Sequence, residues 1–190
     1  ITNKYSRKFA HILRYKNEGL LISYKTINVD NPHLNCRLNG LINFSPKILV
    51  IDKYLNTKIN SNIVNNAKKL KTYIFYSDAN NKKINLFRSK KISLIKIKLN
   101  YNKKFDIKEV LKKIYELGIS HVLFEGGKNL TETFLKSGFI NQFYFIQSNT
   151  LLKNNGKFNI NNVINILNKK FKSKSLVNTF VDKDRIIRYF

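Results

Sequence analysis

The sequence predicts an α/β fold built around a largely parallel β-sheet. Short apolar runs with the length of buried strands recur through the first two thirds of the chain, separated by polar or amphipathic segments. One amphipathic pattern, over residues 106–118, leads directly into an apolar run at 119–124, as in βαβ units. Over the last third, strand patterns follow one another with little helix between them, which predicts antiparallel pairing at one edge.

The N-terminal elements are a helix, a strand and a loop. Phe9, Ile12 and Leu13 recur at helical spacing among basic residues, and Gly19 follows as a stop signal. Pro32, preceded by an asparagine, indicates irregular chain. The predicted elements are an amphipathic helix over 4–17, a buried strand over 20–24 and a loop over 26–38.

In the middle of the chain, buried strands alternate with helices. The helix over 106–118 is the clearest, because its apolar side chains form one stripe and Gly118 stands where a left-handed residue would end it. The other predicted elements are strands over 48–52, 72–76, 92–99 and 119–124, and a short helix over 63–70.

The C-terminal third is strand-rich. A modest apolar rhythm within 153–174 predicts a surface helix with basic flanks, and the turn residues 182–184 predict a hairpin that closes the edge of the sheet. The predicted strands are 142–147, 176–181 and 185–190. The last strand leaves pairing across a homodimer open.

The formal net charge of +25 is the most unusual global property. By itself it would indicate a polyanionic partner such as nucleic acid. The positive residues are mostly lysines spread among Asn and Ile along the whole chain, as an AT-biased coding sequence leaves them, and arginine is scarce. We therefore favour a solvated lysine surface over a nucleic-acid surface, although a positive field would still attract small anionic substrates.

Composition also argues against a disulfide, a metal site and a membrane span. The lone Cys36 has no internal partner, and no histidine spacing resembles a zinc site, so we expect no metal and a cytoplasmic setting. No apolar run approaches the ~18 residues that a membrane span needs. The 190 residues suit one domain, and because the chain begins with Ile1 rather than Met, we expect a fragment of a longer protein.

A glycine pair, Gly126 and Gly127, follows the strand at 119–124 and precedes a predicted short helix. Such a junction at the carboxyl edge of a parallel sheet exposes backbone N–H groups that bind phosphate. Asn129 and Glu132 would cap this helix. A plain tight turn explains the glycines equally well, because neither a dinucleotide-binding glycine motif nor a P-loop is complete here.

Further polar residues stand where strands end. Glu125 closes an apolar strand, and we favour a ligand contact for it over an exposed edge position. Thr26, Asp30 and Arg37 follow the strand at 20–24, and Arg14 lies on the preceding helix. In a lysine-rich chain the two arginines indicate a two-point grip on an oxyanion. A turn cap at Asp30, a structural Thr26 and a surface Arg37 remain alternatives.

No nucleophile and base stand in a recognised arrangement, which favours a reaction carried by a cofactor.

Three ordered segments resemble the reductase domain of the RibD family of bifunctional riboflavin-biosynthesis deaminase-reductases. They are ITNKYSRKFAHILRYKNEGLLISYKTINVDNPHLNCRL, ILVIDKYLNTK and HVLFEGGKNLTETFLKSGFINQFYFIQSNTLL. The resemblance runs, with gaps, from residue 1 to about 156. It implies a dihydrofolate-reductase-like three-layer sandwich, with a mixed, mostly parallel sheet, helices on both faces and a C-terminal antiparallel hairpin.

The resemblance implies NADPH-dependent reduction of the ribosyl group of 5-amino-6-(5-phosphoribosylamino)uracil to the ribityl product. The partner is then a phosphorylated small molecule rather than nucleic acid or membrane. Asp30 or an ordered water is the candidate for proton delivery. By position, the implied substrate contacts are Arg14, Leu34, Arg37 and Glu125, and the implied NADPH contacts are Thr26, Asp30, Gly127, Lys128, Asn129, Leu130, Thr131, Glu132 and Thr133.

The chain also departs from that family. The family's first strand and its deaminase half, which holds zinc, have no counterpart after Ile1, so we expect residues 1–190 to be a single reductase domain that binds incompletely alone. Lys53 stands where the family often has a small polar residue near NADPH, and Gly126 where the family varies. Two alternatives stay open: a stand-alone reductase relative acting on a diaminopyrimidinone ribosyl phosphate, and a basic nucleic-acid-binding domain.

Overall fold

The computed structural model describes residues 2–150 and 159–190 of the chain. It divides into two compact units. The parallel unit comprises residues 11–126, and the antiparallel unit comprises residues 1–10 and 127–190. The expectation that residues 1–190 form one reductase domain stays a prediction.

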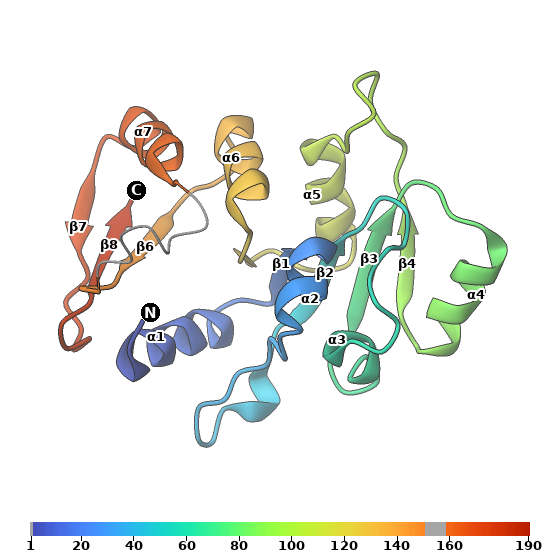
Figure 1. The fold of residues 1–190 in the computed structure, drawn as a ribbon, viewed down its shortest axis with the longest axis horizontal. Coiled ribbons are helices and arrows are strands. Elements are labelled where there is room, and N and C mark those ends of the chain that lie inside the picture. Colours follow the sequence, from blue (N-terminus) through green and yellow to red (C-terminus); the bar gives the residue numbers. More distant parts are fainter. Residues whose placement is uncertain (1, 151–158) are drawn as a thin grey trace. The chain divides into compact units, whose positions relative to one another are not determined.

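The parallel unit is built on a five-stranded sheet in the order β4-β3-β2-β1-β5 (Figure 1). Every neighbouring pair in this sheet is parallel. The strands are β1 (Gly19–Ser23), β2 (Lys47–Ile51), β3 (Thr72–Tyr76), β4 (Ser93–Lys96) and β5 (Val122–Phe124). The helices are α2 (Tyr24–Asp30), the 3-10 helix η1 (Ile42–Phe44), α3 (Asn62–Asn65), α4 (Asn81–Ser89) and α5 (Ile107–Glu116).

Helices cover both faces of this sheet, because successive strand residues point to opposite sides. On one face Leu20 and Ile48 share a buried cluster with Ile27 of α2 and Phe87 of α4. On the other face Leu49 and its partner Leu21 on β1 are fully buried, and α5 contributes the buried Val110 and Ile114. Figure 1 shows α2 in front of the sheet and α5 behind it. The predicted three-layer arrangement is therefore confirmed for this unit.

The antiparallel unit holds, among the described residues, a three-stranded antiparallel sheet in the order β6-β8-β7. One face packs against two helices through Leu135, Leu167 and Tyr189. On the other face Tyr144 meets Phe9 edge-on, with ring centroids 5.6 Å apart. The elements are β6 (Phe143–Gln147), β7 (Lys174–Leu176), β8 (Arg185–Tyr189), α6 (Lys128–Ser137), α7 (Asn161–Lys170) and α1 (Lys4–Tyr15), which begins here and continues into the parallel unit.

A buried carboxylate ties α1 to the β7–β8 hairpin within this unit. Asp184 accepts hydrogen bonds from the Ser6 hydroxyl, at 2.6 Å, and from the Asn3 backbone N–H, at 3.0 Å. These bonds, with that from Ser6 the stronger influence, hold the pKa of Asp184 below its ordinary value. The Asn3 side chain also donates to the Val181 carbonyl. The start of the helix and the turn of the hairpin are thus fixed to each other.

The structure confirms the fold class and most strands, and corrects several elements. Residues 26–30, expected as loop, belong to helix α2, because Ser23 caps that helix and Asn31 ends it in a left-handed conformation. The strand expected at 176–181 is wrong beyond Leu176, since β7 spans Lys174–Leu176. Its hairpin partner β8 pairs with β6, so these strands form a sheet of their own instead of closing the parallel one.

Smaller differences concern helices. Gly127, not Asn129, is the residue at the start of α6, so the expected capping role of Asn129 is wrong. The sequence reading did not anticipate α4, and the helix expected within 153–174 is α7, which begins at Asn161; residues 151–158 of that range lie outside the described part. No helix among the described residues combines the length and apolar character needed to cross a membrane.

Candidate functional site

The central feature of the candidate site is a two-point ion pair between Arg14 and Glu125. The arginine Nε donates to Oε1 and Nη2 donates to Oε2, both at 2.8 Å. Glu125 directly follows β5, and its backbone N–H donates to the Leu21 carbonyl, so it lies at the carboxyl edge beside β1. Arg14 comes from the last turn of α1. The structure therefore brings together two residues that the sequence nominated separately.

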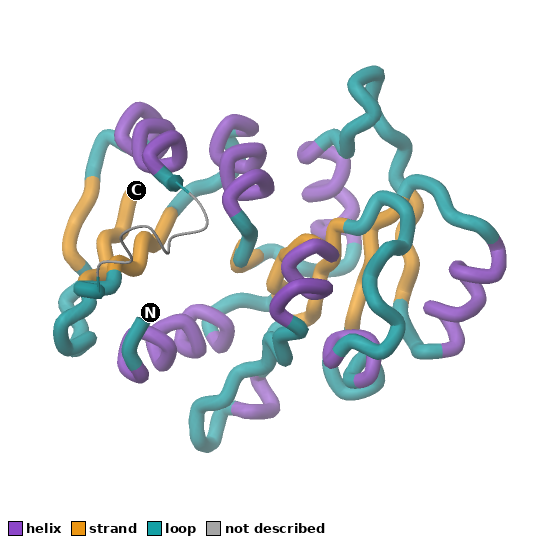
Figure 2. Tube along the Cα trace, viewed as in Figure 1, coloured by secondary structure: helices purple, strands orange, loops and turns teal. Residues whose placement is uncertain are grey.

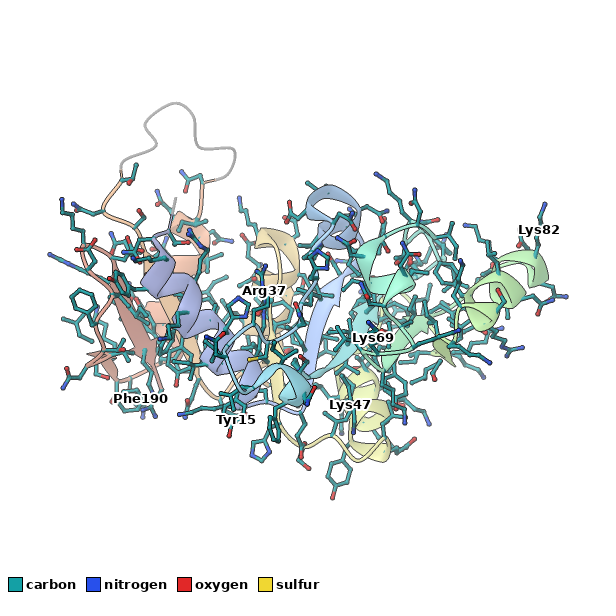
Figure 3. All side chains as sticks on the ribbon, turned by 90° about the horizontal axis from the view of Figure 1, so that it is seen from below. Tyr15, Arg37, Lys47, Lys69, Lys82 and Phe190 are labelled. Atoms are coloured by element: carbon teal, nitrogen blue, oxygen red, sulfur yellow. The ribbon has the colours of Figure 1, made fainter. Side chains whose placement is uncertain are left out.

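The segment 35–37 is fastened beside this pair at three successive residues. The Asn35 carbonyl accepts from Arg14 Nη1 at 3.3 Å. The Cys36 N–H donates to Ser45 Oγ at 3.0 Å, and the Arg37 N–H donates to Nδ1 of His11 at 3.3 Å. The Arg37 side chain is exposed (Figure 3). An exposed guanidinium on a fixed backbone, next to a second arginine, suits the binding of an anion.

His11 lies within this cationic cluster. Partial burial is the largest cause that lowers its pKa, followed by the positive charges of Arg14 and Arg37. The Asn35 backbone and the Glu125 carboxylate act in the opposite direction, to a smaller extent. A neutral imidazole agrees with the geometry, since Nδ1 accepts the Arg37 N–H and an acceptor nitrogen cannot carry a proton.

Thr26 and Asp30 stand at opposite ends of α2. Thr26 lies in the first turn, where its N–H donates to Ser23 Oγ at 3.3 Å. Asp30 is the last residue of the helix and is exposed. Helical rise separates it from the start of α2 by about 9 Å. In the described part of the chain the Asp30 carboxylate has no hydrogen-bond or ion-pair partner, and the structure does not join it to Glu125.

Two asparagines hold α2 against the loop that follows β2. Asn28 accepts from the Lys58 N–H, at 2.8 Å, and donates to the Asn56 carbonyl. Asn31 accepts from the Asn62 N–H at 2.8 Å. Figure 2 shows the helix α2 beside the strands of the parallel unit. Its position, and therefore that of Thr26, depends on these bonds as well as on the buried Ile27.

Leu34 lies between α2 and the anchored segment. Its side chain is buried in the cluster that covers the sheet, and its backbone has a positive φ of 57°. A left-handed backbone costs a leucine on the order of 1 kcal/mol. Because the side chain faces the core, a ligand contact from Leu34 would come from its backbone.

The residues proposed at the start of α6 belong to the antiparallel unit. Gly127 precedes the helix, and no described side chain caps it, so the first backbone N–H groups of a ten-residue helix are open to an anion. Thr131 is buried, and the hydroxyl of the exposed Thr133 donates to the Asn129 carbonyl at 2.9 Å. Backbone groups are therefore better placed for binding than the two threonine hydroxyls.

Sequence reasoning missed three contributors to the parallel unit's edge. His11 stands three residues before Arg14 and therefore on the same helix face. This spacing is the sequence feature that could have placed His11 beside Arg14. Asn35 acts through its backbone carbonyl, which no residue type reveals. Asp52 directly follows the apolar strand β2 and accepts hydrogen bonds from Asn56 and Thr57, which shapes the next loop. No group of His, Cys, Asp and Glu arranged to hold a metal ion occurs within the described ranges.

Several curated proteins are similar to this chain. RibD, a riboflavin biosynthesis protein of Aquifex aeolicus, is 31% identical over 142 residues, which cover 75% of this chain and 38% of the relative. A 2,5-diamino-6-ribosylamino-4(3H)-pyrimidinone 5′-phosphate reductase of Debaryomyces hansenii is 24% identical over 148 residues, covering 71% of this chain and 59% of the relative. The chain thus spans less than two thirds of the length of either relative.

Solved structures show the same fold. The riboflavin biosynthesis reductase Rib7 of Saccharomyces cerevisiae matches with a TM-score of 0.72 at 19% identity, covering 98% of this chain and 80% of that one. Acinetobacter baumannii RibD also gives a TM-score of 0.72 at 19% identity, covering 100% of this chain and 51% of that one. The family described as the RibD C-terminal domain matches residues 1–176. This chain belongs to the RibD C-terminal domain family.

Proposed function

We propose that the chain carries a reductase activity of riboflavin biosynthesis. The reaction is the NADPH-dependent reduction of the ribosyl group of 5-amino-6-(5-phosphoribosylamino)uracil to the ribityl product. The observation that supports it most strongly is the Arg14–Glu125 pair at the carboxyl edge of the sheet, in a chain of the RibD C-terminal domain family. Relatives named for this pathway and for a reductase support the same assignment.

The proposed substrate contacts divide by charge. Arg37, with its exposed side chain and fixed backbone, would bind the substrate phosphate. Glu125 has both oxygens held in place by Arg14, so its remaining lone pairs are fixed in direction and would accept from polar N–H or O–H groups of the substrate. The backbone of Leu34 would complete the set.

The proposed cofactor contacts comprise Thr26, Asp30 and residues 127–133. The start of α6 suits a nicotinamide dinucleotide, because no described side chain caps it and its backbone N–H groups can bind the phosphates of the cofactor. A net charge of +25 favours the additional phosphate of NADPH over NADH. When bound, the reduced nicotinamide supplies a hydride. Asp30, exposed at the end of α2, or an ordered water would supply the proton.

The test is an NADPH oxidation assay on the complete protein with two substrates, the aminouracil ribosyl phosphate and the diaminopyrimidinone ribosyl phosphate. Loss of NADPH absorbance only with the aminouracil supports the proposal. Preference for the diaminopyrimidinone would support the second candidate, which the Debaryomyces hansenii relative favours. Unchanged absorbance at saturating concentrations of both would reject a reductase of either kind, and replacing NADPH by NADH in the same assay measures the cofactor preference.

We further propose a cytoplasmic setting and leave a homodimer as a measurable question. The substrates named for the relatives are small phosphorylated metabolites, which agrees with a cytoplasmic enzyme. Light scattering of the complete protein gives its mass in solution and decides between monomer and dimer.

A further inference from the structure

We propose that His11 is a positioning residue that fixes Arg37 for binding the phosphate of the substrate. The family resemblance assigns roles to the two arginines but none to the histidine. This role of His11 rests on the proposed function only in that the proposed function names the substrate whose phosphate is bound. Its structural core is the connection from His11 to the backbone that carries Arg37.

His11 makes hydrogen bonds to two of the three fastened residues of segment 35–37, and the backbone of the third, Asn35, also acts on its imidazole. Its Nδ1 accepts the Arg37 N–H at 3.3 Å, and its backbone carbonyl accepts from the Cys36 thiol at 3.6 Å. Arg14, one turn later on the same helix, donates to the Asn35 carbonyl. One face of α1 therefore fastens all three residues, and His11 is the member that reaches Arg37.

An apolar side chain at position 11 would fill the space but leave the Arg37 N–H without this acceptor. Arg37 is exposed, so its side chain has little packing to hold it and depends on the direction of its backbone. Freeing that backbone would add conformational entropy to the unbound state, and binding would then have to remove it. The expected consequence is weaker phosphate binding with little change in the chemistry of reduction.

The protonation state of the imidazole matters for the same reason. The charged groups that act on His11 are Arg14 and Arg37, which disfavour the imidazolium, and Glu125, which favours it. Burial adds to the effect of the arginines and lowers the pKa of His11. Protonation would remove the Nδ1 acceptor and release the Arg37 N–H. Phosphate binding should therefore weaken as the pH falls through the lowered pKa of His11, in a way that a variant without an imidazole does not reproduce.

The experiment compares His11→Leu, His11→Asn and the wild type in the complete protein. Asparagine can place its side-chain oxygen near the position of Nδ1, whereas leucine cannot accept a hydrogen bond. His121→Leu is the matched control, because that exposed histidine lies next to the amino end of β5, at the opposite edge of the sheet. Calorimetry with ribose 5-phosphate measures binding without turnover, and steady-state assays separate KM from kcat.

We expect His11→Leu to weaken ribose 5-phosphate binding and raise KM by about tenfold, as the loss of one anchoring hydrogen bond implies, with kcat within about twofold. His11→Asn should recover most of the affinity, and His121→Leu should match the wild type. Unchanged affinity in His11→Leu would overturn the inference, as would a fall in kcat alone. If the leucine variant does not fold, the asparagine variant decides. The inference is overturned if His11→Asn binds ribose 5-phosphate as weakly as an Arg37→Ala variant does.

Two further readings separate this inference from the proposed function. Nuclear magnetic resonance of the wild type should show an unprotonated Nδ1 on His11 at neutral pH and slow exchange of the Arg37 amide; a protonated Nδ1 would overturn the inference. A protein that binds ribose 5-phosphate through His11 but oxidises no NADPH would refute the proposed reaction and leave the positioning role standing. Wild-type protein that fails to bind ribose 5-phosphate would refute the positioning role.

Discussion

Arg14 and Glu125 are joined by two parallel hydrogen bonds of 2.8 Å, although 111 residues separate them in the chain. The pair is partly buried, with 14% of the arginine side chain and 29% of the glutamate side chain exposed. The bond between Arg14 Nη1 and the Asn35 carbonyl extends the contact to a third segment. The end of α1, the end of β5 and the segment after α2 are therefore fixed by one guanidinium.

Replacing Arg14 by lysine should impair both stability and catalysis. An ammonium group is a single point and cannot satisfy both oxygens of Glu125 and the Asn35 carbonyl together. We expect kcat/KM to fall by about ten- to a hundredfold, and a double-mutant cycle with Glu125→Gln to give a coupling of about 1 kcal/mol, since the pair is partly solvated.

The exposed pair Lys113–Glu116 on α5 is the control for that cycle, at a similar distance of 2.7 Å but with both side chains more than a third exposed. Urea unfolding of each single and double variant supplies the stabilities. A coupling in the Arg14 cycle no larger than that of the control pair would contradict the structural role of the ion pair.

Gly126 should not tolerate a side chain. A Cβ atom built there would lie 2.0 Å from Cζ of Phe124, closer than any two carbons can approach without a bond. The ring must move, and overpacking of this kind costs typically about 1–3 kcal/mol. Gly126→Ala should therefore lower the urea midpoint, and Phe124→Leu should make the same change less costly. Full additivity of the two substitutions would show that the ring does not set the constraint.

The strands of the parallel sheet were predictable because their signal is local. β3 spans the predicted residues 72–76, and β1 and β2 are displaced by one residue. Apolar runs bounded by turn residues need no knowledge of distant chain. The same holds for Gly138, which ends α6 with a φ of 84°.

Elements that depend on distant contacts were not predictable in this way. The polar sequence of α2 reads as a loop, yet Ile27 is buried in the core and Asn28 and Asn31 bind a loop some thirty residues later. β7 was displaced, because its register is set by pairing with β8 and not by its own side chains, all of which are exposed. Tertiary contacts outweigh local propensity in both cases.

The sequence predicted which residues belong to the candidate site but not which of them contact one another. Spacing alone does not show that Arg14 grips Glu125, and the resemblance gave both only as substrate contacts. The link between His11 and the Arg37 backbone involves a main-chain donor, which a sequence does not distinguish from any other residue. Site geometry built from backbone groups therefore needed the structure.

Stability should depend on pH through Glu18. Its carboxylate accepts from the backbone N–H groups of Ser120, at 2.6 Å, and His121, at 3.1 Å, and these bonds lower its pKa, that from Ser120 most. Because the folded pKa lies below the unfolded one, the contribution is present above the unfolded value of about 4.3 and disappears as the pH falls through the folded pKa.

Glu18→Gln should accordingly be less stable than the wild type at neutral pH, and the two should converge as the pH falls below the folded pKa of Glu18, where both side chains are uncharged. Urea midpoints measured across this range test the prediction. Asp78→Asn is the control, since Asp78 is exposed and its carboxylate accepts no hydrogen bond among the described residues. A difference that persists unchanged at low pH would assign the effect to packing instead of ionisation.

The positive surface should bind nucleic acid only weakly and without sequence preference. Exposed lysines such as Lys69 and Lys82 come from separate elements, and Figure 3 shows Lys82 projecting away from α4. Contacts of this kind release counterions, so affinity for a protein with several phosphate contacts falls about a thousandfold or more between roughly 50 and 200 mM salt. Fluorescence anisotropy with duplex and single-stranded oligonucleotides of two sequences measures this.

We expect binding at low salt that vanishes near physiological salt and does not distinguish the sequences. Lys82→Glu should lower the low-salt affinity slightly and leave NADPH oxidation unchanged, because α4 carries none of the proposed contacts. Binding that survives physiological salt and discriminates one sequence would instead support a nucleic-acid-binding function. The scarcity of arginine favours weak binding without sequence preference. Lysine carries a solvated point charge, which is less suited than the arginine fork to forming two hydrogen bonds with one base.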